Sequence, residues 1–202
     1  MACVVTGFSQ VKHKPLVRRG GKRPSSGQLK DFNQLAAEAN IVFTFPKGLK
    51  EIAVPDNEDF SFDYAMELPG REFEVWFQVR SLKTDWINYQ LYNSDASKQT
   101  ENPDSLYNKN GRAQAIAFTG DQNFISRNIP ADILARYNAS AGKTYLLNLQ
   151  DTPETKHYKY ALLITLEKDH TGTIIAVCFT NDKGPEFFKN ISKVSKCLKF
   201  KP

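Results

Sequence analysis

Histidine and cysteine are the side chains best suited to nucleophilic or metal-binding chemistry, and the chain has three of each: His13, His157, His170, Cys3, Cys178 and Cys197. No CxxC motif or close Cys/His pair occurs, so the spacing predicts neither a zinc site nor a disulfide scaffold. Cys178 and His170 share one predicted hairpin, but Cys178 lies about six residues beyond the turn at ~3.3 Å per residue, far from the imidazole. We expect no catalytic residue, no metal site and no cofactor.

Cys178 and Cys197 are interpreted instead as small buried hydrophobic side chains, because Cys178 lies in mid-strand and Cys197 near a helix end. A disulfide bond between them stays open. The acidic group Asp56, Glu58 and Asp59 lacks the spaced Asp, Asn, Gly and Glu residues of a calcium loop, so a solvated turn is predicted there.

Aromatic residues give a different signal in residues 85–115, which are rich in Asn, Ser, Asp and Lys. The pattern predicts a short helix followed by a long polar loop, and aromatic side chains with a polar tip on such a loop are typical of binding surfaces. The candidate binding residues are Trp86, Tyr89, Tyr92 and Tyr107. Two alternatives stay open: these aromatics pin the loop to the core, or the segment carries the polar site of a hydrolase or other enzyme.

The net charge of +5 comes from the first part of the chain. Six basic residues lie between Lys12 and Arg23, before the first acid, Asp31, and without these six 21 basic residues face 22 acidic ones. The folded part therefore lacks the basic face of a nucleic-acid-binding protein. We interpret residues 1–26 as a signal-like remnant and a basic linker, and residues 27–202 as one domain. This predicts an extracytoplasmic protein, periplasmic or secreted, with a cytoplasmic one as the alternative.

The periodicity of the last third of the chain indicates the elements that must carry any site. Residues 158–166 and 173–180 alternate as two strands with apolar residues on both faces, which requires a layer on each side of the sheet. Gly184 and Pro185 start a helix whose predicted apolar face is Phe187, Phe188, Ile191, Val194 and Leu198. No run reaches the ~20 apolar residues of a membrane span, so no transmembrane segment is predicted.

Other stretches predict further elements of the same sheet. A helix is expected after Ser26, strands at 41–45 and 49–54, and a hairpin of 60–68 and 73–79 with one apolar and one mostly polar face. A helix starting at Pro130 and ending near Gly142 precedes a strand at 144–149. Together these patterns predict an α+β fold in which an antiparallel sheet lies between helices.

The order of elements resembles a known family at three places. These are the segment 43–52, the hairpin 160–179 and the closing helix that ends in Cys197-Leu198-Lys199-Phe200. Together they resemble the Mog/PsbP-like fold, an α/β/α sandwich, over residues 28–200, and are similar in pattern to exported bacterial proteins of about this length. Members of that group serve as a photosystem accessory subunit and as a partner of the Ran GTPase.

The resemblance implies a non-enzymatic exported binding or accessory domain, with a protein or a cell-envelope component as its partner. No motif of the chain allows a metal-binding or GTPase-binding residue to be carried over from that group. The fold alone does not identify the partner.

Overall fold

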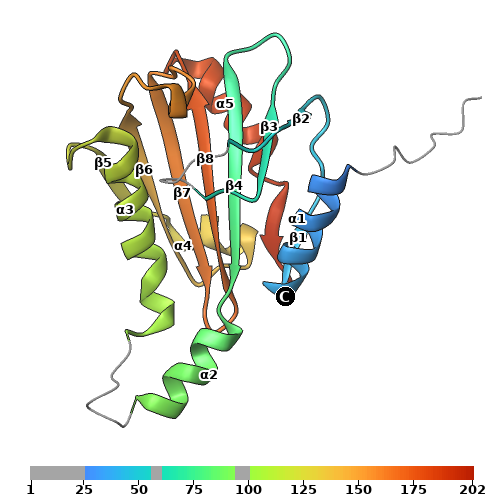
Figure 1. The fold of residues 1–202 in the computed structure, drawn as a ribbon, viewed down its shortest axis with the longest axis vertical. Helices are drawn as coiled ribbons and strands as arrows, with labels where there is room; N and C mark the ends of the chain where they lie inside the picture. Colours follow the sequence, from blue (N-terminus) through green and yellow to red (C-terminus); the bar gives the residue numbers. More distant parts are fainter. Residues whose placement is uncertain (1–25, 56–60, 94–100) are drawn as a thin grey trace, which may run out of the picture.

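The computed structural model describes residues 26–55, 61–93 and 101–202, and its main element is a seven-stranded antiparallel sheet (Figure 1). In spatial order the strands are β2 (Lys50–Ile52), β3 (Tyr64–Glu67), β4 (Phe73–Ser81), β8 (Gly172–Thr180), β7 (Tyr160–Lys168), β6 (Ala141–Asn148) and β5 (Ile125–Asn128). A separate two-stranded ribbon pairs β1 (Ile41–Phe43) with β9 (Leu198–Phe200).

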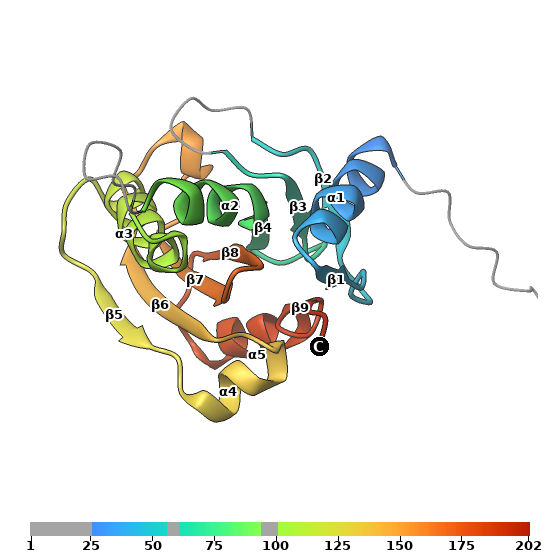
Figure 2. The same ribbon diagram turned by 90° about the horizontal axis from the view of Figure 1, so that it is seen from below.

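Helices lie on both faces of this sheet, and one extends past its end. They are α1 (Gly27–Glu38), α2 (Lys83–Tyr92), α3 (Leu106–Thr119), α4 (Ala131–Tyr137) and α5 (Pro185–Val194), with short 3₁₀ turns η1 (Pro103–Ser105) and η2 (Pro153–Thr155). Figure 2 shows α3 on one side of the sheet and α4 and α5 on the other. The predicted α+β class, an antiparallel sheet between helices, is confirmed.

The central hairpin β7–β8 is buried on both faces, as its alternation predicts. Leu162, Ile164 and Leu166 contribute to the core shared with α1 and α5. Leu163 and Val177 are cross-strand partners and belong to the core under α3. Gly111 lets α3 lie close to the sheet, because a Cβ atom there would come within 2.5 Å of the Cγ2 atom of Thr165.

Local signals fix the ends of several helices. Ser26 caps α1 by accepting a hydrogen bond from the backbone N–H of Leu29 at 3.1 Å. Asn40 follows that helix with a φ of 57°, as expected for a residue that ends one. Residues 1–25, with the predicted remnant and most of the linker, lie outside the described residues, as does the acidic group at 56–59; the domain boundary at residue 26 stays a prediction.

The closing helix is shorter than predicted. It ends at Val194, and Leu198 belongs to β9, where it pairs with Phe43 of β1. Phe187 and Val194 are buried against the sheet, whereas Phe188 is 51% exposed. The predicted helical face was therefore wrong at Phe188, which is exposed, and at Leu198. Leu198 was misassigned because the pairing partner of β9 lies near the start of the domain, which helical periodicity cannot reveal.

Three further predictions need correction. The second face of the β3–β4 hairpin is more covered than predicted, since Trp76 of β4 is buried beneath Phe62 and α3 and Glu74 is 7% exposed. The helix from Pro130 ends at Asn138, which adopts a left-handed φ of 52°, and Gly142 lies inside β6. The long polar loop expected before residue 115 is wrong as well, because residues 103–119 form η1 and α3.

Candidate functional site

Helix α2 extends past the end of the sheet (Figure 1), and none of its residues is buried. The exposed fraction is 58% for Ile87, 65% for Leu91 and 41% for Tyr92. Ile87 and Leu91 are four residues apart and therefore lie on the same side of the helix. Large apolar side chains gathered on a projecting helix are typical of contact surfaces. We call Ile87, Leu91 and Tyr92 the α2 surface.

Trp86 connects the N-terminal part of α2 to η1 and to the end of the sheet. Its indole Nε1 donates a hydrogen bond of 2.9 Å to Asp104 Oδ1 in η1, and its ring meets the His170 ring edge-on at a centroid distance of 4.0 Å. Tyr89 packs edge-on against Trp86 at 5.1 Å. Because His170 lies in the β7–β8 turn, one side chain connects α2, η1 and the central hairpin.

Beside Trp86 three carboxylates converge. Asp104 of η1, Glu167 of β7 and Asp169 of the β7–β8 turn each place a carboxylate oxygen within 4.8 Å of the other two. Asp104 is held from two sides, since it also accepts the backbone N–H of His170 at 2.9 Å. Hard cations such as Ca²⁺ bind to oxygen ligands of this type. We call these three residues the carboxylate cluster.

Glu167 is the unusual member of the cluster, because it is only 1% exposed and its Oε1 atom has no hydrogen-bond partner. Burial, and after it the negative charges of Asp104 and Asp169, raise the pKa of Glu167 to about 8. Tyr107 of α3 lies near it, and burial followed by the charge of Glu167 raises the pKa of that phenol.

A polar cavity of about 350 Å³ lies between the α3 helix and the sheet, next to the cluster. It is lined by Asp63, Gln78, Val79, Arg80, Tyr107, Asn110, Ala113, Gln114, Thr173 and Ile175. Burial raises the pKa of Asp63, an effect opposed by the hydrogen bond that its Oδ2 accepts from the Val79 N–H at 2.7 Å. A cavity of this size is at the lower end of the range for small-molecule pockets.

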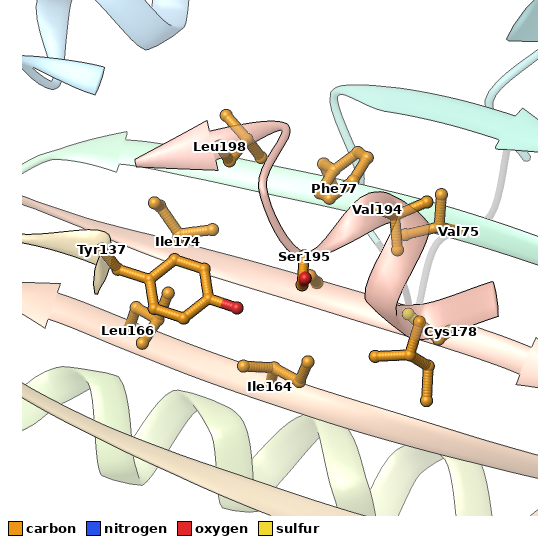
Figure 3. A pocket seen from close by; sticks show the side chains of 12 residues that line it. Val75, Phe77, Tyr137, Ile164, Leu166, Ile174, Cys178, Val194, Ser195 and Leu198 are labelled. Atoms are coloured by element: carbon orange, nitrogen blue, oxygen red, sulfur yellow. The ribbon is translucent and has the colours of Figure 1, made fainter. Parts of the chain in front are cut away.

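A small apolar void lies on the other face of the sheet. Figure 3 shows its lining, in which Tyr137 and Ser195 supply the polar atoms among side chains such as Ile164, Val194 and Cys178. Its volume of about 30 Å³ matches a single water molecule rather than a ligand. Cys178 and Cys197 are buried free thiols, and burial raises the pKa of both, which makes them poor nucleophiles.

The predicted binding residues are brought together only in part. Trp86 and Tyr89 pack on each other, Tyr92 belongs to the exposed α2 surface, and Tyr107 lies apart in α3 beside Glu167 and the polar cavity. The three carboxylates of the cluster were missed. A signal existed in Glu167, since a charged residue continues the face set by Ala161 and Leu163 in a strand that is apolar on both sides.

The described helices include none with the length and apolar character needed to cross a membrane. This agrees with the sequence, which predicts no transmembrane segment.

Comparisons with known proteins give little further guidance. No protein-family model and no curated protein matches the chain. Among solved structures, the chain is similar to cyanobacterial PsbP (CyanoP) from Synechocystis sp. PCC 6803, with 10% sequence identity and a TM-score of 0.43. The alignment covers 81% of this chain and 88% of that chain. A similarity of this size does not transfer a function or a site.

Proposed function

We propose that this chain is a non-enzymatic, extracytoplasmic binding domain that inserts the α2 surface into an apolar groove of a partner protein. The observation that carries the proposal is the exposure of Ile87 and Leu91 on a helix with no buried residue. Recognition of an amphipathic helix by a groove uses anchors at this i, i+4 spacing.

The chemistry of α2 favours a partner that is apolar rather than charged. The helix carries one basic and one acidic residue, Lys83 and Asp85, both in its first turn. Asp85 is already engaged by Arg80 at 2.8 Å, so the outer part of the helix presents no charge. Trp86 holds the base of the helix against Asp104, which lowers the entropy lost when the helix binds.

A hydrolase or other enzyme is the second candidate, and the polar cavity beneath α3 is the observation that favours it. The described residues give it limited support, because neither described histidine lines that cavity, although each has an aspartate partner. His157 Nδ1 lies 2.6 Å from Asp151 Oδ1, and His170 Nε2 lies 3.4 Å from Asp104 Oδ2. A nucleophilic serine or cysteine would need such a base within hydrogen-bond reach.

Site-specific photo-crosslinking tests the proposal directly. A photoreactive amino acid replaces the exposed Gln90, and the adduct formed in living cells is measured with and without the double change Ile87→Ser and Leu91→Ser. We expect the adduct to fall at least about tenfold, because both anchors are lost together. Phe188→Ser is the matched control, since Phe188 is also exposed, at 51%, but lies on α5.

Two results would contradict this function. An adduct unchanged by the double substitution would remove α2 from the contact. Turnover of an ester or phosphoester substrate that is lost in Asp63→Asn would favour the enzyme, because Asp63 lines the polar cavity and lies outside the α2 surface.

A further inference from the structure

The carboxylate cluster has the negative charge of a cation-binding site. In the described ranges, none of its three residues forms an ion pair with Lys or Arg that would balance this charge, and Asp104 has the His170 imidazole 3.4 Å away. Three carboxylates with oxygens within 4.8 Å of one another repel, and one of them is buried. A buried carboxylate with no countercharge is strongly unfavourable unless it is neutralised.

We propose that Asp104, Glu167 and Asp169 form a Ca²⁺ site that links η1 to the β7–β8 turn. The second observation beside the acidic cluster is the unpartnered Oε1 atom of Glu167, in a side chain that is almost completely buried. The donor set consists of oxygen atoms, which favours a hard cation over a thiolate-seeking or imidazole-seeking one.

Calcium matches this set better than magnesium. Ca²⁺ accepts about six to eight oxygen ligands in a flexible geometry, whereas Mg²⁺ keeps several waters and uses one or two carboxylates. Asp104 is oriented by the Trp86 indole and by the backbone N–H of His170, each at 2.9 Å on Oδ1. Such outer contacts hold a ligand in place and leave its other oxygen for the cation.

The side chains around Glu167 come from several elements. Glu167 faces Asp104 from η1, Asp169 from the turn and Tyr107 from α3. His170 of the turn lies beside Asp104. Thr173, the cross-strand neighbour of Glu167, pairs in turn with Arg80, which is engaged by Asp85.

Calorimetric titration of the full chain with CaCl₂ and, separately, MgCl₂ at pH 7 tests the site. We expect one Ca²⁺ per chain with a Kd below about 1 mM and weaker binding of Mg²⁺. Glu167→Gln and Asp169→Asn should each weaken Ca²⁺ binding at least about tenfold. Asp169 is exposed, so its substitution tests the ligand with little risk to the fold.

Asp132→Asn is the matched control, because Asp132 lies on α4 across the sheet and its side chain is 70% exposed. It should bind Ca²⁺ like the unaltered protein. The site is refuted if Ca²⁺ does not bind up to about 10 mM, if Mg²⁺ binds as tightly, or if the two cluster variants bind Ca²⁺ unchanged. These readouts do not involve the α2 partner, so the site can fail while the proposed function holds, and the reverse.

Discussion

Two glutamates are buried on the same face of the sheet, near opposite ends, and their surroundings differ. Glu74 of β4 is 7% exposed, receives the Lys156 Nζ at 2.8 and 3.0 Å, and accepts the Trp76 indole N–H at 2.9 Å. Glu167 of β7 is 1% exposed and has two carboxylates beside it instead of a cation. The first site is electrostatically complete, whereas the second requires a proton or an added ion.

The two glutamates differ because the connecting segments beside them supply side chains of different charge. Lys156 follows η2 in a left-handed turn with a φ of 51°, and this turn brings its ammonium group to Glu74. At the other end, η1 and the β7–β8 turn bring Asp104 and Asp169 to Glu167. In a structural ion pair the two charges balance each other. A buried charge without a balancing partner is therefore a better indicator of a binding site than a buried ion pair.

The largest loss of stability should come from an apolar core residue on the face of the sheet opposite the two glutamates. The effects at both glutamates can be compared with this loss. Phe187 is 2% exposed, and Phe187→Ala should lower the free energy of unfolding by about 3 to 5 kcal/mol because a cavity remains. Denaturant melts measure this. Phe188→Ala is the control, with an expected loss below about 1 kcal/mol; equal losses in the two variants would show that α5 does not bury Phe187.

Without its countercharge, Glu74 should resemble Glu167, because both would be buried carboxylates with no cation beside them. Lys156→Met leaves a buried carboxylate unpaired, and we expect a loss of about 2 to 4 kcal/mol, reduced from the fully buried case because the lysine side chain is 40% exposed. Lys50→Met breaks the exposed pair with Glu67 and should cost less than about 1 kcal/mol. If both variants lose the same stability in urea, Glu74 does not depend on Lys156.

Removing the charge of Glu167 should raise the stability, whereas removing the countercharge of Glu74 should lower it. The pKa of Glu167 is raised to about 8, so the folded, metal-free chain binds a proton that the unfolded chain has already lost. Stability contributed by this proton is present at acid pH and is lost as pH rises toward about 8. Glu167→Gln should therefore be more stable than the unaltered chain by about 1 to 2 kcal/mol at pH 9 in chelator.

Unfolding at pH 5 and at pH 9 measures this change, and the two proteins should differ little at pH 5. Glu186→Gln, an exposed acid of α5, provides the control and should show no such pH dependence. A glutamine variant that is less stable at pH 9 would mean that Glu167 is satisfied as a carboxylate.

The smallest effect concerns the connection between the cluster and α2. Trp86→Phe removes the indole N–H that Asp104 accepts while keeping most of the ring, and should cost about 0.5 to 1.5 kcal/mol. Hydrogen exchange should then report faster opening of α2 than of β7. Ile87→Ser, at an exposed site, should leave both exchange rates unchanged.

Much of the fold could be predicted from the sequence because local patterns agree with it. The alternation of residues 173–180, the cap at Ser26 and the Gly184-Pro185 start all appear in the structure as predicted. The predictions that failed were those that depend on distant partners. Leu198 became part of β9 because Phe43 pairs with it, and the face of β4 that was predicted to be mostly polar became partly buried because Phe62 and α3 cover Trp76.

The sequence by itself determined the class of fold and the aromatic character of residues 86–107. Alternation and capping act over a few residues, so they can be read along the chain. Only the tertiary structure decided that Asp104, Glu167 and Asp169 meet, because η1 and the β7–β8 turn are more than sixty residues apart in sequence and are brought together by the docking of α2, η1 and α3 on the hairpin. Electrostatic coupling depends on distance in space rather than along the chain, and no local pattern encodes that distance.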